Sequence, residues 1–130
     1  KNAKINAVSR YGKEGFEFHQ KPEGTAMTVA FELDGMHFTA LNGGPLYKFT
    51  EAISMQVMCA TQEEIDHFWN NLTEGGEESM CGWLKDRYGL SWQIVPEILP
   101  QLMTDPARAG RVTNAFLKMR KFDIAKLLEA

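Results

Sequence analysis

The sequence predicts an α+β fold in which two strand-rich modules are followed by helices, and three observations lead to this class. Two segments rich in β-branched and aromatic residues are joined by Asp34-Gly35, a dipeptide suited to a tight hairpin turn. Thr61 and Glu64 form a capping box at the start of an amphipathic helix. Residues 34–41 and 88–95 can be laid on each other, each as a turn glycine followed by an alternating strand. Hairpins therefore recur at corresponding places in both halves.

The first half of the chain predicts three strands. Residues 5–11 alternate irregularly between apolar and polar side chains and are read as the first strand. The polar segment 13–24, which contains Gly and Pro, is expected to be a loop. Residues 25–33 and 36–41 are the two strands of the hairpin. Asn42-Gly43-Gly44-Pro45 ends the return strand.

The second half predicts a β-α-β-β unit. A strand over residues 52–59 leads into the capped helix, which Gly75-Gly76 terminates. Four side chains at helical spacing form its apolar stripe: Ile65, Phe68, Trp69 and Leu72. Strands over residues 78–84 and 90–95 follow, joined by the turn Asp86-Arg87-Tyr88-Gly89.

The end of the chain is expected to be helical. Residues 98–103 form a short amphipathic piece, Asp105-Pro106 begins a longer helix that runs to about Met119, and Asp123 caps a last helix. This segment is basic, through Arg108, Arg111, Lys118, Arg120 and Lys121. We interpret it as a solvated helix face beside an acidic body rather than as a DNA- or phosphate-binding tail.

Composition limits the class of protein. The chain has 130 residues, of which 44% are hydrophobic and 24% charged, with a net charge of −3, so there is room for one domain with one sizeable core. No apolar stretch approaches the roughly 20 residues that span a bilayer, and the charge balance does not favour a nucleic-acid partner. Cys59 and Cys81 have neither metal-ligand spacing nor a disulfide framework. We expect reduced thiols in a cytoplasmic protein.

The two halves are unequal, because the first lacks the strand and helix that open the second. We therefore expect one domain over residues 1–130, with a partial first module at 1–48, a second module at 49–96 and C-terminal helices at 97–130. We also expect a strand and a helix to precede Lys1, or a partner subunit to cover the surface that they would cover.

Three motifs carry a resemblance to a known family. They are Asn42-Gly43-Gly44-Pro45, the run Gly75-Gly76-Glu77-Glu78-Ser79 before Cys81-Gly82-Trp83, and the segment 86–96, Asp-Arg-Tyr-Gly-Leu-Ser-Trp-Gln-Ile-Val-Pro. From about Lys4 to the C-terminal helices the chain resembles the PhnB-like family, often labelled "3-demethylubiquinone-9 3-methyltransferase domain". That family lies in the vicinal oxygen chelate superfamily of glyoxalases, extradiol dioxygenases and bleomycin-resistance proteins. The resemblance implies paired βαβββ modules, a cup-shaped sheet and a homodimer.

The resemblance also implies where a metal would be bound, and the residues there are poor ligands. Metal-using members of the superfamily hold a divalent ion with His, Gln and Glu side chains from four strands. The corresponding positions here fall before Lys1, near Thr39, within residues 51–54 and on Gln93. Neutral hydroxyl and amide groups do not offset the dehydration of the ion, so we expect no metal cofactor. His37 is interpreted as a structural histidine, and His19 and His67 as loop and solvent-facing residues.

Methyl transfer is not expected, despite the family label. A site for S-adenosylmethionine commonly needs a glycine-rich turn between a strand and a helix. Gly43-Gly44-Pro45 precedes a predicted strand instead, and so presents no helix N-terminal amides to a ligand.

Strand parity predicts which side chains line the cup, with Trp92 and Ile94 turned toward the helix layer. The predicted ligand-binding residues are His37, Thr39, Ser54, Gln56, Cys81, Trp83, Ser91 and Gln93. For Cys81, a buried inert thiol is expected rather than a nucleophile. Such a mixed lining suits a small organic molecule. Two functions stay open: a metal-free binding protein like the bleomycin-resistance branch, or a metal-dependent lyase, isomerase or dioxygenase.

Overall fold

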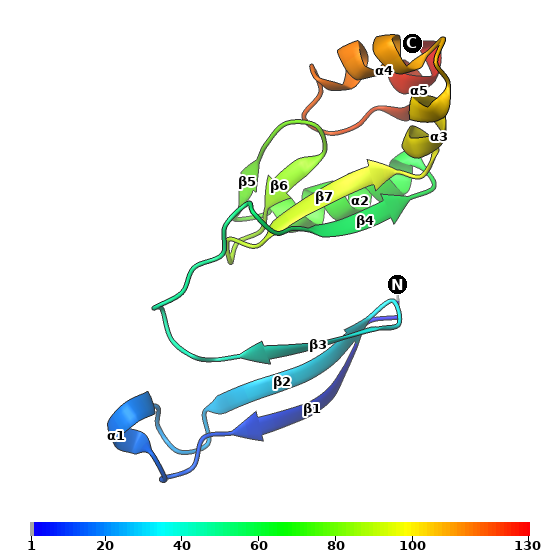
Figure 1. Ribbon diagram of the computed structural model, residues 1–130. Coiled ribbons are helices and arrows are strands. Elements are labelled where there is room, and N and C mark those ends of the chain that lie inside the picture. The colour runs from blue at the N-terminus through cyan, green and yellow to red at the C-terminus, as the bar shows by residue number, and fades with distance from the viewer. Residues whose placement is uncertain (1) are drawn as a thin grey trace. The chain divides into compact units, whose positions relative to one another are not determined.

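The computed structural model describes residues 2–130, which form two compact units; the first ends at Tyr47 and the second begins at Lys48 (Figure 1). Each unit is built around its own sheet. None of the helices in the described part of the chain is long and apolar enough to cross a membrane.

The first unit is an antiparallel sheet in the order β1-β2-β3. Its elements are β1 (Lys4–Arg10), α1 (Phe16–His19), β2 (Ala26–Leu33) and β3 (Met36–Leu41). The predicted hairpin is confirmed, with Asp34 and Gly35 at φ 49° and 84° in the turn. The segment expected to be only a loop contains the one-turn helix α1, which lies between the left-handed residues Gly15 and Gln20.

The two faces of this sheet differ in polarity. One face is apolar: Phe31 stacks on its cross-strand partner Phe38 with ring centroids 5.3 Å apart, and Val29 pairs with Val8 and Ala40. Ile5 on the same face is 70% exposed. Polar side chains, with Glu32 pairing across strands with Lys4 and His37, gather on the opposite face.

The second unit is a complete βαβββ module, as the resemblance implies, and has one strand more than the β-α-β-β unit that the sequence predicted; helices follow it. Its elements are β4 (Met55–Cys59), α2 (Gln62–Thr73), β5 (Glu77–Glu78), β6 (Trp83–Lys85), β7 (Ser91–Pro96), α3 (Ile98–Thr104), α4 (Ala109–Phe116) and α5 (Ile124–Glu129). The sheet order is β4-β7-β6-β5, with β4 parallel to β7 and the other pairs antiparallel. Such a fold is α+β, as expected.

Helix α2 begins with the predicted cap and covers one face of this sheet (Figure 1). Thr61 Oγ1 accepts a hydrogen bond from the Glu64 amide at 3.2 Å, and the Glu64 carboxylate accepts one from the Ala60 amide. The apolar stripe of α2 packs Ile65 and Trp69 into the buried core of the unit. Sheet residues that share this core include Leu84 and Ile94, and the C-terminal segment adds Val112, Phe122 and Leu127.

Several predicted boundaries were wrong, and the strand expected over residues 52–59 begins only at Met55. The strand expected over residues 78–84 is two strands, β5 and β6, because Cys81 and Gly82 adopt left-handed φ angles of 57° and 79° that an extended strand does not allow. The long helix expected from Asp105-Pro106 begins only at Ala109, since Asp105 Oδ1 accepts from the Ala107 amide in a tight turn at 2.9 Å. The cap of Asp123 on α5 is confirmed.

The basic C-terminal segment makes ion pairs within the second unit. Lys121 Nζ lies 2.6 Å from Asp66 Oδ1, and Arg120 Nη1 lies 3.7 Å from Glu78 Oε2. The hydrogen bond from Lys121 is the main cause that lowers the pKa of Asp66. These cations therefore lie beside acidic side chains of α2 and β5.

Candidate functional site

The face of the second sheet opposite α2 carries a row of polar and aromatic side chains. Strand register places Gln93 of β7 directly between Trp83 of β6 and Gln56 of β4, so the three side chains share one face. The Gln93 amide donates from Nε2 to Ser54 Oγ at 2.8 Å. The helix-facing residues predicted by parity are confirmed as well, because Ile94 is buried in the core and Trp92 packs against it.

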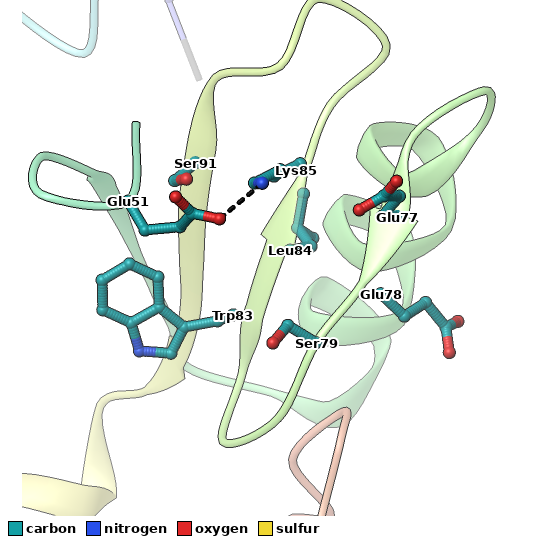
Figure 2. A pocket seen from close by; sticks show the side chains of 8 residues that line it. All are labelled: Glu51, Glu77, Glu78, Ser79, Trp83, Leu84, Lys85 and Ser91. Carbon is teal, nitrogen blue, oxygen red and sulfur yellow. Dashed lines mark ion pairs between the residues drawn. The ribbon is translucent and has the colours of Figure 1, made fainter. Parts of the chain in front are cut away.

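A second row on the same face crosses β5, β6 and β7. Glu77, Lys85 and Ser91 are successive cross-strand partners. Together with Trp83 they line a cavity of about 370 Å³ (Figure 2). Glu51, from the segment before β4, reaches into this cavity, where its Oε1 lies 2.5 Å from Lys85 Nζ.

The charges in this cavity hold one another in the ionised form. The hydrogen bond from Lys85 is the largest cause that lowers the pKa of Glu51, and the same bond raises the pKa of Lys85. The negative charge of Glu77 raises the pKa of Lys85 further. Glu78, the neighbour of Glu77 in β5, points away from Lys85 in Figure 2 and accepts a hydrogen bond from Trp69 Nε1 at 2.9 Å.

Ser91 differs from the other polar residues that line the cavity in being almost completely buried. Its exposed fraction is 1%, and its hydroxyl makes no hydrogen bond with any residue that the structure describes. Buried hydroxyl groups are normally paired, since leaving one without a partner costs free energy. A polar group of this kind in the wall of a cavity is suited to a bound molecule.

Cys81 does not lie on this face, contrary to the parity prediction. The prediction assumed a strand through residue 81, whereas Cys81 lies in the turn between β5 and β6. Its backbone amide donates to Met119 and its Sγ lies 3.6 Å from the Phe116 carbonyl oxygen. The thiol therefore packs against the C-terminal helices, as an inert structural cysteine would.

The two predicted residues of the first unit share the polar face of its sheet. His37 and Thr39 are exposed and pair across β2 with Glu32 and Ala30. His37 Nδ1 lies 3.9 Å from Glu32 Oε2. The predicted residues thus divide between the two units. His37 and Thr39 lie on the sheet of the first unit, whereas Gln56, Trp83, Ser91 and Gln93 lie on the sheet of the second, with Ser54 directly before β4.

At the superfamily's metal positions, Thr39, Ser54 and Gln93 offer neutral side chains, which are poor ligands for a divalent ion. Gln93 presents its Nε2 donor to Ser54, and both side chains are neutral, as is Thr39. Within residues 2–130, no group of three or more His, Cys, Asp or Glu side chains is arranged to hold a metal. The other histidines lie elsewhere: His67 is exposed on α2, and the His19 ring contacts that of Tyr11 in a tilted arrangement with ring centroids 4.5 Å apart.

Sequence reasoning missed Glu51, Glu77 and Lys85 as site residues. Parity alone would have found Lys85, because it lies two residues from Trp83 on the same strand face. The position of Glu51 depends on the path of an irregular segment, which leaves no periodic signal in the sequence.

A family model and one solved structure indicate the same family. The family described as 3-demethylubiquinone-9 3-methyltransferase matches residues 1–95. A solved structure described as a putative 3-demethylubiquinone-9 3-methyltransferase, PhnB protein, from Bacillus cereus is 33% identical, with 73% of this chain and 80% of that chain covered and a TM-score of 0.63. A Pseudomonas aeruginosa protein shares the fold at 18% identity, 68% and 78% coverage and a TM-score of 0.50. No curated protein matches.

Proposed function

Because this chain belongs to the 3-demethylubiquinone-9 3-methyltransferase family, the PhnB-like group with a glyoxalase-like fold, we propose that it binds a small organic molecule. The site is the open face of the β4-β7-β6-β5 sheet, and it uses no superfamily-type metal. We also propose a cytoplasmic location, on the ground that the two cysteines lack a disulfide framework.

The observation that carries the proposal is the composition of this open face. Trp83 supplies an apolar plane, Gln93 and Gln56 supply amides, and the adjoining cavity of about 370 Å³ contains one ion pair. An apolar surface with a few convergent polar groups is the usual form of a small-molecule site.

The same residues argue against the two enzymatic alternatives. The hydroxyl and amide groups at Thr39, Ser54 and Gln93 are weak donors for a divalent ion, which argues against a metal-dependent lyase, isomerase or dioxygenase. Methyl transfer is disfavoured because the glycine pairs do not lie in a turn that leads from a strand into a helix. Gly75-Gly76 follows α2 and leads into β5, whereas a cofactor-binding turn leads from a strand into a helix.

A binding screen with a matched pair of variants tests the proposal. A ligand found by its effect on the melting temperature is expected to bind Gln93→Leu about tenfold more weakly, because one polar contact is lost while side-chain volume is kept. Gln101→Leu, at an exposed amide of α3, is expected to bind like the unchanged protein.

Elemental analysis of the purified protein is expected to find a divalent metal well below one ion per chain. A tightly held stoichiometric ion contradicts the proposal and favours the metal-dependent enzyme.

We propose a homodimer as the assembly, supported by the exposed apolar face of the β1-β2-β3 sheet. Ile5 and Met36 on this face are 70% and 63% exposed. Light scattering after gel filtration is expected to give the mass of two chains, and Ile5→Lys is expected to reduce it to one because a charge cannot be buried unpaired. Leu46→Lys, which lies outside the strands at 79% exposure, serves as the control. A single-chain mass at micromolar concentrations contradicts the dimer.

A further inference from the structure

We propose that the cavity beside Trp83 receives the carboxylate of a small organic acid, which Lys85 and Ser91 hold in the place that Glu51 occupies in this structure. The inference rests on the proposed function and names the class of ligand. On this view Glu51 is an internal occupant that the ligand displaces.

Lys85 and Ser91 form a pair of hydrogen-bond donors on adjacent strands. They are direct cross-strand partners in β6 and β7, so their side chains point to the same face and lie side by side. The Lys85 ammonium supplies a charge-assisted donor, and the Ser91 hydroxyl supplies a second donor that no described residue uses. Two adjacent donors match the two oxygens of one carboxylate.

Glu51 shows that a carboxylate fits against Lys85. Its Oε1 lies 2.5 Å from Lys85 Nζ, and Figure 2 shows its carboxylate beside Ser91 and Lys85. Glu51 belongs to neither a helix nor a strand, and its side chain is 63% exposed, so little packing holds it in place. An incoming carboxylate that also engages Ser91 would satisfy a donor that Glu51 leaves without a hydrogen bond.

Trp83 supplies the surface for the rest of the ligand. It lies two residues from Lys85 on β6 and lines the same cavity (Figure 2). An indole plane beside an ammonium group suits an acid with a flat apolar body.

The charges that line the cavity also allow a competing hypothesis, in which the ligand carries an amine instead of a carboxylate. Three carboxylates line the cavity, those of Glu51, Glu77 and Glu78, against the single ammonium of Lys85. Glu78 points away from Lys85 and accepts a hydrogen bond from Trp69. With Glu51 displaced, Lys85 loses the partner of its ion pair, and the ligand carboxylate takes that place. An amine-bearing ligand would instead need Glu51 and Glu77 to stay, so Glu51 distinguishes the two chemistries.

Benzoate and benzylamine, which share a ring and differ in charge, test the inference on the full chain by titration with NMR detection. Benzoate is expected to shift the backbone amides of Lys85 and Ser91 and the indole signal of Trp83. Its affinity is expected to rise about tenfold in Glu51→Gln, which removes the competing charge, and to fall about tenfold or more in Lys85→Met and in Ser91→Ala. Glu74→Gln breaks a surface ion pair with Arg87 and is expected to leave benzoate binding unchanged.

Some results would overturn the carboxylate inference and leave the proposed function standing. If benzylamine binds and Glu51→Gln weakens it, the site takes a cation. If neither probe binds but a ligand from the screen is weakened by Gln93→Leu, the open face binds a molecule of another class. If Gln93→Leu weakens no ligand at all, the proposed function fails, and the inference fails with it. If benzoate binds Glu51→Gln, Lys85→Met and Ser91→Ala with the affinity of the unchanged protein, the carboxylate inference is overturned and the proposed function is not.

Discussion

Replacing Gly82 with alanine is expected to lower the free energy of unfolding of the second unit by about 3 kcal/mol or more. Gly82 has a φ of +79°, and a Cβ atom added there would lie 2.4 Å from Cε2 of Phe122 and 2.7 Å from the carbonyl oxygen of Ile94. Phe122 is 2% exposed and Ile94 is completely buried, so neither neighbour can move without disturbing the core. The residue thus combines backbone strain with a clash on two sides.

Hydrogen bonds make this position still less tolerant. The Gly82 amide donates to the carbonyl of Arg120 at 2.7 Å, and its own carbonyl accepts from the Ile94 amide at 2.8 Å. Any shift that relieves the clash stretches one of these bonds, and one of them ties the C-terminal segment to the sheet. We therefore expect Gly82→Ala to detach the C-terminal helices as well.

Gly89→Ala is the matched control for this prediction, measured by urea denaturation with Trp fluorescence. Gly89 has a similar φ of +84°, but nothing lies within 4 Å of the added Cβ. Only the left-handed backbone is penalised, so a loss of about 1–2 kcal/mol is expected. If Gly82→Ala is no more destabilising than Gly89→Ala, the steric explanation is wrong.

Elements with a local signal were predictable from the sequence. The hairpin at Asp34-Gly35, the capping box of Thr61 and Glu64, and the cap of Asp123 each depend on residues within four positions of one another. Such signals act through the backbone nearby and do not require knowledge of the rest of the fold.

The turn between β5 and β6 was not predictable, because distant residues select it. Cys81 adopts a φ of 57°, which is uncommon for a residue with a side chain. Its amide donates to the Met119 carbonyl at 2.8 Å, and the next amide, of Gly82, donates to Arg120. These partners lie more than thirty residues away, so alternation of apolar residues alone indicated one continuous strand.

Part of the candidate site was likewise predictable from the sequence, and part of it was not. Parity placed Gln56, Trp83 and Gln93 on one face, and the strand register does so too. Their part in ligand binding stays a prediction. The ion pair of Glu51 and Lys85 joins an irregular segment to a strand more than thirty residues away, which no periodic pattern indicates.

Asp86→Ala is expected to lower the free energy of unfolding by about 2–3 kcal/mol, because one carboxylate satisfies three donors. Its Oδ1 accepts from the amides of Tyr88 and Leu90 at 2.9 and 3.1 Å, and its Oδ2 accepts from Trp92 Nε1 at 3.0 Å. The first two bonds shape the turn between β6 and β7. The third fixes the indole of Trp92, which packs against the core.

Two further variants separate these contributions in urea denaturation followed by Trp fluorescence. Asp86→Asn keeps an acceptor for the turn but turns an amide donor, instead of an acceptor, toward the indole N–H, so about half of the loss is expected. Arg87→Ala alters the neighbouring exposed residue, whose ion pair with Glu74 spans 3.7 Å at the surface, and is expected to change stability by less than about 0.5 kcal/mol. An Asp86→Ala variant as stable as Arg87→Ala would show that the carboxylate does not hold the turn.

Asp86 also lies between the two residues proposed to bind a carboxylate. It directly follows Lys85 at the end of β6, and the turn that it shapes leads to Ser91 at the start of β7. The loss of its hydrogen bonds would loosen the register that sets these two donors side by side. We therefore expect Asp86→Ala to weaken benzoate binding even at temperatures where the unit stays folded, whereas Arg87→Ala leaves the affinity unchanged. Retained benzoate affinity in a folded Asp86→Ala protein would show that the strand pairing alone positions Lys85 and Ser91.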